Sequence, residues 1–269
     1  MTELEQLRHD CMGIIRQAGG MARQRMYTAT ARRKADRSPV TDVDQAVQDF
    51  LMDAIARRFG DDAVISEETQ SDPGRHASVA TARRCWIIDP IDGTRNYVRK
   101  VPMFAVSVGL LSQGSPVVGW VYNPMTDQLY SASQGGGAWL DDARIYCSQT
   151  PPTGEVFIGL PSGREEPLPA VVHGWIDRMV QRATGSTALN LALVAAGCFD
   201  AVFGNNCKLW DIAAGAIIVQ EAGGRLTDHQ GRSYFPLDPA AYRNTPTPFL
   251  AGGSALVQYL VSELRAGRC

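Results

Sequence analysis

Apolar side chains recur at the spacing of an α-helix in several stretches of this chain. Near its start they include Leu4 and Ile15, and the pattern predicts a helix over residues 3–26. A second helical pattern begins after Thr41, whose hydroxyl can cap a helix N-terminus, and continues to Gly60. Further helices are predicted at residues 167–180, 187–197, 210–222 and 254–265.

Short apolar runs rich in β-branched residues alternate with turn residues in the middle of the chain. They predict strands at residues 104–111, 116–122 and 128–133, which should form an antiparallel meander. Loops are expected at residues 162–166 and 238–248. The remaining strands are predicted at residues 63–66, 85–89, 156–160, 200–204, 224–228 and 249–252. Because both halves of the chain mix helices with strands, the sequence predicts a layered α+β or α/β fold.

The length of 269 residues allows one large domain or two closely packed ones. A boundary, if there is one, is expected near residues 148–154. It would separate an N-terminal α+β half, residues 1–150, from a C-terminal α/β half, residues 151–269. We expect the two halves to form one compact unit.

The composition excludes several classes of partner. With 45% hydrophobic residues, 20% charged residues and a net charge of −2, the chain has no basic excess for binding nucleic acid or a membrane surface. No apolar run approaches the roughly 18 residues that a membrane span needs. The 6 cysteines include no C-x-x-C pair. The absence of such a pair disfavours a zinc site or a redox motif. We therefore expect reduced thiols and a cytoplasmic protein.

Two carboxylates stand close together after the predicted strand at residues 85–89. The segment W-I-I-D-P-I-D-G places Asp89 and Asp92 where a buried apolar strand ends in a Pro/Gly turn. Carboxylates this close need neutralisation, which hard divalent cations with oxygen ligands provide. Ile91 leaves its carbonyl as a neutral ligand, and Gly93 lets the backbone approach an anion. Taken alone, the segment has an alternative interpretation as a loop with two solvated aspartates.

Other acidic residues stand at the ends of predicted elements, where a cleft can gather them. Glu67 and Glu68 follow a short strand, whereas Asp44 and Asp211 lie at helix starts. Because a helix N-terminus stabilises a carboxylate, Asp44 and Asp211 each have an alternative interpretation as helix caps. The 4 histidines form no pattern, and we expect them at the surface rather than in catalysis: His9, His76, His173 and His229.

Several segments occur in the order seen in the inositol monophosphatase family, which the chain resembles over about residues 34–228. D-P-I-D-G-T at residues 89–94 and W-D-x-A-A-G at residues 210–215 match the two signatures of that family. The other matching segments are K-A-D-x-S-P-V-T-x-x-D at 34–44, S-E-E at 66–68, G-S-x-A-L-N at 185–190 and E-A-G-G at 221–224.

The resemblance implies an α-β-α-β-α sandwich of the sugar-phosphatase type. It also implies an enzyme, a phosphoric monoester hydrolase that uses two or three Mg²⁺ ions per active site to hydrolyse a small phosphate ester. By this resemblance Glu67, Asp89 and the Ile91 carbonyl hold the first ion. Asp89, Asp92 and Asp211 hold the second, and Glu67 with waters holds a weaker third.

The same resemblance implies roles for the residues around the ions. Asp44 and Thr94 orient the attacking water, with Glu67 also counted among the catalytic residues. The amides of Gly93 and Thr94 bind the phosphate, and the substrate pocket is lined by Gly185 and Ser186. The substrate expected first is inositol 1-phosphate or a similar polyol phosphate. A homodimer is the expected assembly.

One position departs from the family's pattern. Animal inositol monophosphatases carry a glutamate seven residues before the aspartate that corresponds to Asp211, and it hydrogen-bonds the inositol ring. Here that position is Gly204. The K-x-D-x-S-P-V-T form also resembles relatives that act on histidinol phosphate or on 3′-phosphoadenosine 5′-phosphate. Histidinol phosphatase and 3′(2′),5′-bisphosphate nucleotidase therefore stay open as alternatives, as does an inactive family member used as a scaffold.

Overall fold

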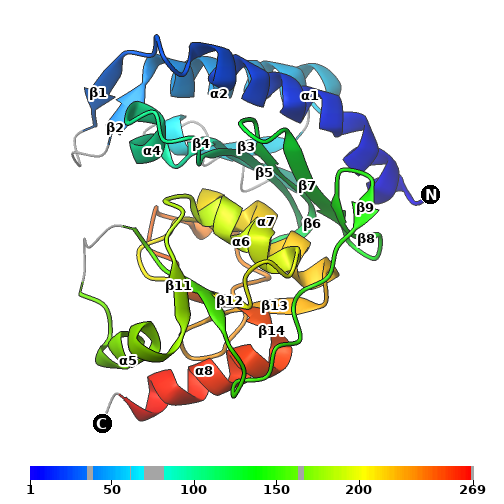
Figure 1. Cartoon of the computed structure of the whole chain (residues 1–269). Helices are drawn as coiled ribbons and strands as arrows, with labels where there is room; N and C mark the ends of the chain where they lie inside the picture. Colours follow the sequence, from blue (N-terminus) through cyan, green and yellow to red (C-terminus); the bar gives the residue numbers. More distant parts are fainter. Residues whose placement is uncertain (35–38, 61, 70–81, 163–166, 268–269) are drawn as a thin grey trace.

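Helices and sheets alternate in layers across the protein, in the order α, β, α, β, α (Figure 1). The structure is a computed structural model and describes residues 1–34, 39–60, 62–69, 82–162 and 167–267. The layering confirms the predicted fold class. The helices are α1 (Glu3–Arg25), α2 (Asp42–Arg58), α4 (Thr94–Val98), α5 (Ala170–Arg178), α6 (Thr187–Ala195), α7 (Leu209–Glu221) and α8 (Ser254–Ala266), with short 3₁₀ turns η1 (Glu67–Thr69) and η2 (Pro239–Ala241).

The N-terminal part of the chain builds a large sheet covered on its outer face by α1 and α2 (Figure 1). Its strands follow chain order: β3 (Ala63–Ser66), β4 (Arg84–Asp92), β5 (Ala105–Ser112), β6 (Ser115–Asn123), β7 (Gln128–Ser133), β8 (Gly137–Leu140) and β9 (Ala143–Arg144). Only β3 and β4 pair in parallel among these described strands, so the predicted antiparallel meander is confirmed. Apolar side chains such as Val47 and Trp86 fill the contact with the helices.

The central layer consists of α6 and α7, which lie between the two sheets (Figure 1). Glycines on β5 and β6 allow α7 to approach the large sheet closely. A Cβ at Gly119 would stand 2.6 Å from the Ala214 carbonyl oxygen, and one at Gly109 would stand 3.0 Å from the Ala214 nitrogen. Because interiors are close-packed, only a residue without a side chain fits at Gly119 unless the helix shifts.

The C-terminal part of the chain builds a small sheet in the order β11-β10-β12-β14-β13. Its outer face carries α5 and α8, whose apolar residues, Trp175 and Leu260 among them, are fully buried against it. β10 pairs in parallel with β11 and β12, whereas β14 is antiparallel to both of its neighbours. The strands are β10 (Phe157–Gly159), β11 (Val180–Arg182), β12 (Ala201–Gly204), β13 (Gly224–Asp228) and β14 (Phe249–Gly253).

Some elements differ from the sequence-based prediction. β4 continues through Pro90 to Asp92, because its pairing with β5 becomes irregular between Asp89 and Asp92 and requires no donor from the proline. The short strand β11 and the hairpin of β1 (Ala31–Arg33) and β2 (Pro39–Thr41) were not predicted, since three-residue strands carry too little alternation. Of the predicted loop 162–166, only Ser162 is among the described residues.

Three further predictions concern the chain as a whole. The chain passes from the large sheet to the small one between β9 and β10, while the division into halves at residues 148–154 stays a prediction. None of the described helices combines the length and the low charge that a bilayer crossing requires. The described cysteines are all free thiols: Cys11, Cys85, Cys147, Cys198 and Cys207.

Candidate active site

The site begins at the C-terminal end of β4, where the strand leaves regular pairing. Asp89 and Asp92 are almost fully buried, with 2% and 7% of their surface exposed. The Asp89 Oδ1 accepts a hydrogen bond of 3.0 Å from the Ile91 amide, which fixes the bend between the two aspartates. The Ile91 side chain turns into the core, as its complete burial shows.

Asp92 joins the end of β4 to the start of α6. Its Oδ2 accepts a hydrogen bond of 2.6 Å from the Ala188 amide and another from the Ser186 hydroxyl. Ser186 is also the N-cap of α6, where its Oγ accepts from the Leu189 amide. The Asp92 carboxylate therefore faces the positive end of α6, although Asp92 and Ser186 lie 94 residues apart in the sequence.

Asp211 arrives from a third element, the first turn of α7. Its Oδ2 accepts a hydrogen bond of 2.8 Å from the Lys208 amide, so the cap interpretation of this residue holds. The fold nevertheless brings it to the other two aspartates. Carboxylate oxygens of Asp89, Asp92 and Asp211 all lie within 4.8 Å of one another, and we refer to these residues as the acidic cluster.

The acidic cluster is electrostatically unfavourable without a cation. Burial, reinforced by the carboxylates of Glu67 and Asp92, holds the pKa of Asp89 well above its ordinary value. Burial and the Asp92 charge do the same for the pKa of Asp211. Burial raises the pKa of Asp92 to about 6, although hydrogen bonds from Ser186 and Ala188 oppose the shift. A hard divalent ion with oxygen ligands would offset this repulsion, so the donor set fits such a metal.

Glu67 lies close enough to influence the cluster but is held by a lysine. Lys34 Nζ stands 2.6 Å from an oxygen of Glu67 and 2.6 Å from an oxygen of Glu68. Burial lowers the pKa of Lys34, and the two carboxylates outweigh this effect and raise it. The family resemblance implies that Glu67 holds the first metal; in the structure its carboxylate influences Asp89 and is paired with Lys34.

Asp44 and Thr94 meet next to the turn that ends β4. Asp44 is fully buried and closes a capping box at the start of α2, in which its Oδ2 accepts from the Thr41 amide at 2.8 Å. The Thr94 hydroxyl is 3.3 Å from Asp44 Oδ1 and 3.0 Å from the Ile91 carbonyl oxygen. Burial raises the pKa of Asp44 to about 6, against the hydrogen bonds from Thr41. The structure thus confirms the cap interpretation of Asp44 and also brings its carboxylate to Thr94.

Two glycines, Gly93 and Gly185, allow close backbone packing beside the acidic cluster. Gly93 has a φ of +97°, and a Cβ there would stand 3.2 Å from the Gly185 carbonyl oxygen. Gly185 has a φ of +83°, and a Cβ there would stand 2.5 Å from Asn96 Nδ2. Asn96, which sequence reasoning missed, donates to the carbonyl oxygens of Met103 at 2.6 Å and Thr184 at 2.7 Å. Its place two residues after the D-P-I-D-G-T signature was the available signal.

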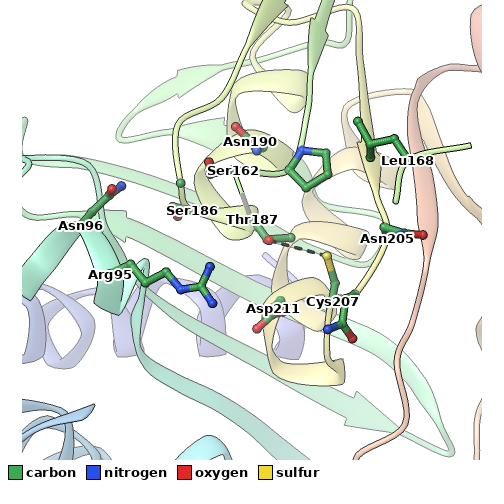
Figure 2. A pocket seen from close by; sticks show the side chains of 13 residues that line it. Arg95, Asn96, Ser162, Leu168, Ser186, Thr187, Asn190, Asn205, Cys207 and Asp211 are labelled. Atoms are coloured by element: carbon green, nitrogen blue, oxygen red, sulfur yellow. Dashed lines mark hydrogen bonds between the residues drawn. The ribbon is translucent and has the colours of Figure 1, made fainter. Parts of the chain in front are cut away.

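A pocket of about 210 Å³ opens beside the acidic cluster (Figure 2). Gly185, Ser186 and Asp211 line it, so the structure brings these predicted residues together. Figure 2 shows the Arg95 side chain extending into the pocket toward the side on which Asp211 lies. Sequence reasoning assigned no role to Arg95 or to the other polar lining residues, which include Asn190, Asn205 and Asn206.

Gly204 has no room for the glutamate that the animal enzymes carry. A Cβ at this position of β12 would stand 2.2 Å from Cε1 of Phe249, which is fully buried. The Gly204 carbonyl oxygen lies 2.9 Å from Nε2 of His229. His229 stacks on Phe203 and is 7% exposed, so the prediction of a surface position was wrong for this histidine. His76 lies outside the described residues.

Comparison with known proteins extends the resemblance to almost the whole chain. The model of the Inositol monophosphatase family matches residues 3–259. The chain belongs to this family. Inositol monophosphatase family proteins generally depend on a metal, and the acidic cluster gives this chain a place for one.

Relatives within the family carry different names. The chain is 32% identical to Nus factor SuhB of Escherichia coli K12 over 93% of this chain and 92% of that protein. It is 33% identical to Inositol monophosphatase 3 of Solanum lycopersicum over 86% of this chain and 89% of that protein. An IMPase structure from Thermotoga maritima superimposes with a TM-score of 0.83 at 27% identity, covering 98% of both chains. Family and fold are therefore shown.

Proposed function

We propose that the protein is a Mg²⁺-dependent phosphomonoesterase that hydrolyses a small phosphorylated metabolite, with inositol 1-phosphate or a similar polyol phosphate as the first substrate to test. The observation that carries this proposal is the acidic cluster. Asp89 and Asp92 are buried and Asp211 is half-buried, the three carboxylates repel one another, and each accepts a hydrogen bond from a backbone amide. A fold would gain nothing from this arrangement unless a cation completed it.

The proposed ligand sets divide the cluster between two ions. Glu67, Asp89 and the Ile91 carbonyl would hold one, and Asp89, Asp92 and Asp211 would hold the other, with Glu67 and waters left for a weaker third. When bound, such ions neutralise phosphoryl oxygens, lower the pKa of a bound water and stabilise the leaving alkoxide. Lys34 Nζ lies 2.6 Å from Oε1 of Glu67, so a metal would bind that carboxylate in competition with the ammonium or through its other oxygen.

Asp44 and Thr94 are proposed to orient the attacking water. The Thr94 hydroxyl has one proton, which it can direct to Asp44 or to the Ile91 carbonyl oxygen. When it donates to Asp44, its lone pairs face away from that carboxylate and can accept from a water. The high pKa of Asp44, about 6, suits a group that receives a proton near neutral pH.

The amides of Gly93 and Thr94 are proposed to bind the phosphate, and Gly185 and Ser186 to line the substrate pocket. Gly93 has a left-handed backbone conformation and lies close to Gly185. Because neither residue has a side chain to cover the backbone, a phosphate oxygen can approach it, which supports this assignment. Two assignments rest on other grounds than this geometry, namely a homodimer, from the family's habit, and a cytoplasmic location, from the cysteine usage of the sequence. The free thiols of the described cysteines agree with the second.

Orthophosphate release tests the proposal. The purified chain should release phosphate from inositol 1-phosphate with Mg²⁺ and not with EDTA. Asp211→Asn should lower kcat/KM by about 1000-fold, because metal stabilisation of the transition state is worth several kcal/mol. Asp53→Asn, which changes an exposed carboxylate on α2, is the matched control and should keep the wild-type rate.

Two results would contradict the proposal. One is a near-normal rate for a folded Asp211→Asn protein, which would remove the metal scheme. The other is no release of phosphate from any polyol, amino-alcohol or nucleotide ester, which would favour the inactive scaffold instead. A kcat/KM comparison of inositol 1-phosphate, histidinol phosphate and adenosine 3′,5′-bisphosphate separates the enzyme alternatives.

A further inference from the structure

The helix that carries Asp211, α7, begins without a side-chain oxygen at its N-cap. Ser, Thr, Asp and Asn are the usual N-cap residues, because their side chains accept from amides of the first turn that have no partner within the helix. The N-cap of α7 is Lys208, whose ammonium can only donate. Leu209, the first residue of the helix, is fully buried. Its amide therefore needs an acceptor from another part of the chain.

That acceptor belongs to the loop between β13 and β14. Tyr242 Oη accepts a hydrogen bond of 3.0 Å from the Leu209 amide, although the two residues lie 33 positions apart in the sequence. The same hydroxyl donates to the Thr245 carbonyl oxygen at 3.3 Å, so its proton is used there and a lone pair faces the helix. The Tyr242 ring meets the Trp210 ring edge to face, with 6.0 Å between the ring centroids.

Further contacts from this loop hold the residues just before the helix. The Cys207 carbonyl oxygen accepts from the Thr247 amide at 2.7 Å and from the Thr247 hydroxyl at 2.9 Å. Lys208 Nζ donates to the Asn244 carbonyl oxygen at 3.0 Å. We call residues 242–247 the clamp, since they contact three consecutive residues at the start of α7.

The clamp holds the part of α7 on which the acidic cluster acts. Carboxylate oxygens of Asp89, Asp92 and Asp211 lie within 4.8 Å of one another, so without a cation their repulsion favours a shift of Asp211 away from the other two. Such a shift of the first turn would leave the buried Leu209 amide without its acceptor, and the hydrogen bond to the clamp opposes it. Metal sites require ligand distances within about 0.2 Å of the usual values, so a small shift matters.

We propose that Tyr242 is a positioning residue for Asp211, which it keeps in place for metal binding by fixing the Leu209 amide and with it the first turn of α7. This inference rests on the proposed function, because it takes Asp211 as a metal ligand. Tyr242 acts through the backbone, and its hydroxyl takes no part in the reaction. The same contacts hold one wall of the substrate pocket, since Cys207 lines that pocket together with Asp211 (Figure 2).

Tyr242→Phe tests the hydroxyl and keeps the ring that packs on Trp210. Loss of a group that orients a metal ligand lowers metal affinity by about 10- to 100-fold, and Tyr242 acts one step further away. Titration calorimetry of the full chain with Mg²⁺ should therefore give a Kd about 3- to 10-fold above that of the wild type. Tyr234→Phe is the matched control and should keep the wild-type Kd. Tyr234 is half-buried in the same loop, but its hydroxyl donates to the Pro248 carbonyl oxygen.

Hydrogen exchange in EDTA adds a readout that needs no metal. The amides of residues 207–211 should exchange about 3- to 10-fold faster in Tyr242→Phe than in the wild type, because an acceptor at the helix start is lost. The amides of α8 should keep their wild-type rates, which separates a local effect from a general loss of stability. Tyr234→Phe should leave the exchange of residues 207–211 unchanged.

Failure of the positioning role and failure of the proposed function give different results. An unchanged Kd in a folded Tyr242→Phe protein, or an equal rise in Tyr234→Phe, overturns the positioning role and leaves the phosphatase in place. A lower Tm with no change in Kd or in exchange at residues 207–211 does the same, since the hydroxyl would then be merely structural. Mg²⁺ binding without phosphate release from any ester overturns the phosphatase, and the comparison of Kd values still decides the role of Tyr242. A wild type that binds no Mg²⁺ overturns both.

A second variant covers the case in which Tyr242→Phe does not fold. Thr247→Val removes the hydroxyl that donates to the Cys207 carbonyl oxygen and leaves the amide that also donates to it. In both measurements it should change the result in the same direction as Tyr242→Phe. A folded Thr247→Val protein with the wild-type Kd and wild-type exchange at residues 207–211 would overturn the role of the clamp.

Discussion

Replacing Asp92 by asparagine should make the metal-free protein more stable and the Mg²⁺-loaded protein less stable than the wild type. Asparagine can keep an oxygen at the position that accepts from Ser186 and Ala188, so the link to α6 survives. What it removes is one charge of the acidic cluster. The order of stability of the two proteins should therefore reverse with the addition of Mg²⁺.

The magnitude is set by two costs of a charged Asp92. Two unit charges 4.8 Å apart repel by about 3.5 kcal/mol at an effective dielectric constant of about 20. The rise in the pKa of Asp92 from 3.8 to about 6, which burial causes first, corresponds to roughly 3 kcal/mol at pH 7.5 and includes the cost of desolvating the charge. Since part of the repulsion is relieved by protonation, we expect a gain of about 2–3 kcal/mol. For a chain of this length it raises Tm by about 4–12 °C.

Thermal unfolding followed by circular dichroism at pH 7.5 measures which of the two proteins is more stable in EDTA and which is more stable in Mg²⁺. In EDTA, Asp92→Asn should unfold at the higher temperature. In Mg²⁺ at about 1000 times its Kd, the wild type gains about 4.1 kcal/mol and should overtake the variant, which binds the ion weakly. Asp53→Asn serves as the control and should follow the wild type in both buffers. A variant that is less stable than the wild type in EDTA, or that gains as much from Mg²⁺, would refute the reasoning.

Two further predictions concern pH and the substrate pocket. In EDTA the free energy of unfolding should fall as pH rises from about 4 to about 6, because the folded protein keeps protons on Asp44 and Asp92, whose pKa values are raised from 3.8 to about 6, after the unfolded chain has lost them. Denaturant titrations at several pH values measure this slope, and a rise over that interval contradicts the shifts. Gly204→Glu should destabilise the protein by about 1–3 kcal/mol without improving kcat/KM for inositol 1-phosphate, because Phe249 occupies the space. Improved turnover of that ester in a stable variant would show that the phenyl ring can move aside.

Local patterns in the sequence carried the prediction of the fold. Thr41 and Asp44 lie three residues apart and form the capping box of α2 without help from distant parts of the chain. The meander was equally readable, because turn residues separate its strands. By contrast β11 has three residues, and its place in the sheet depends on pairing with β10, which no local pattern encodes.

The candidate site was predicted unevenly for the same reason. The pairing of Asp89 with Asp92 follows from their spacing, but their meeting with Asp211 came only from the family resemblance, since it depends on how α7 packs between the sheets. Contacts between side chains far apart in the sequence were not predicted at all. Examples are the hold of Lys34 on Glu67 and the way Phe249 fills the space at Gly204.

The glycines at Gly109 and Gly119, against which α7 packs, bear on how the sequences of related proteins are interpreted. A methyl group at Gly119 would stand 2.6 Å from the Ala214 carbonyl oxygen and would push the helix outward, along with the aspartate in its first turn. The alignment of the acidic cluster thus depends on glycines that do not belong to it. In a related chain that retains every motif of the family, replacement of a strand glycine under this helix should still disturb that alignment.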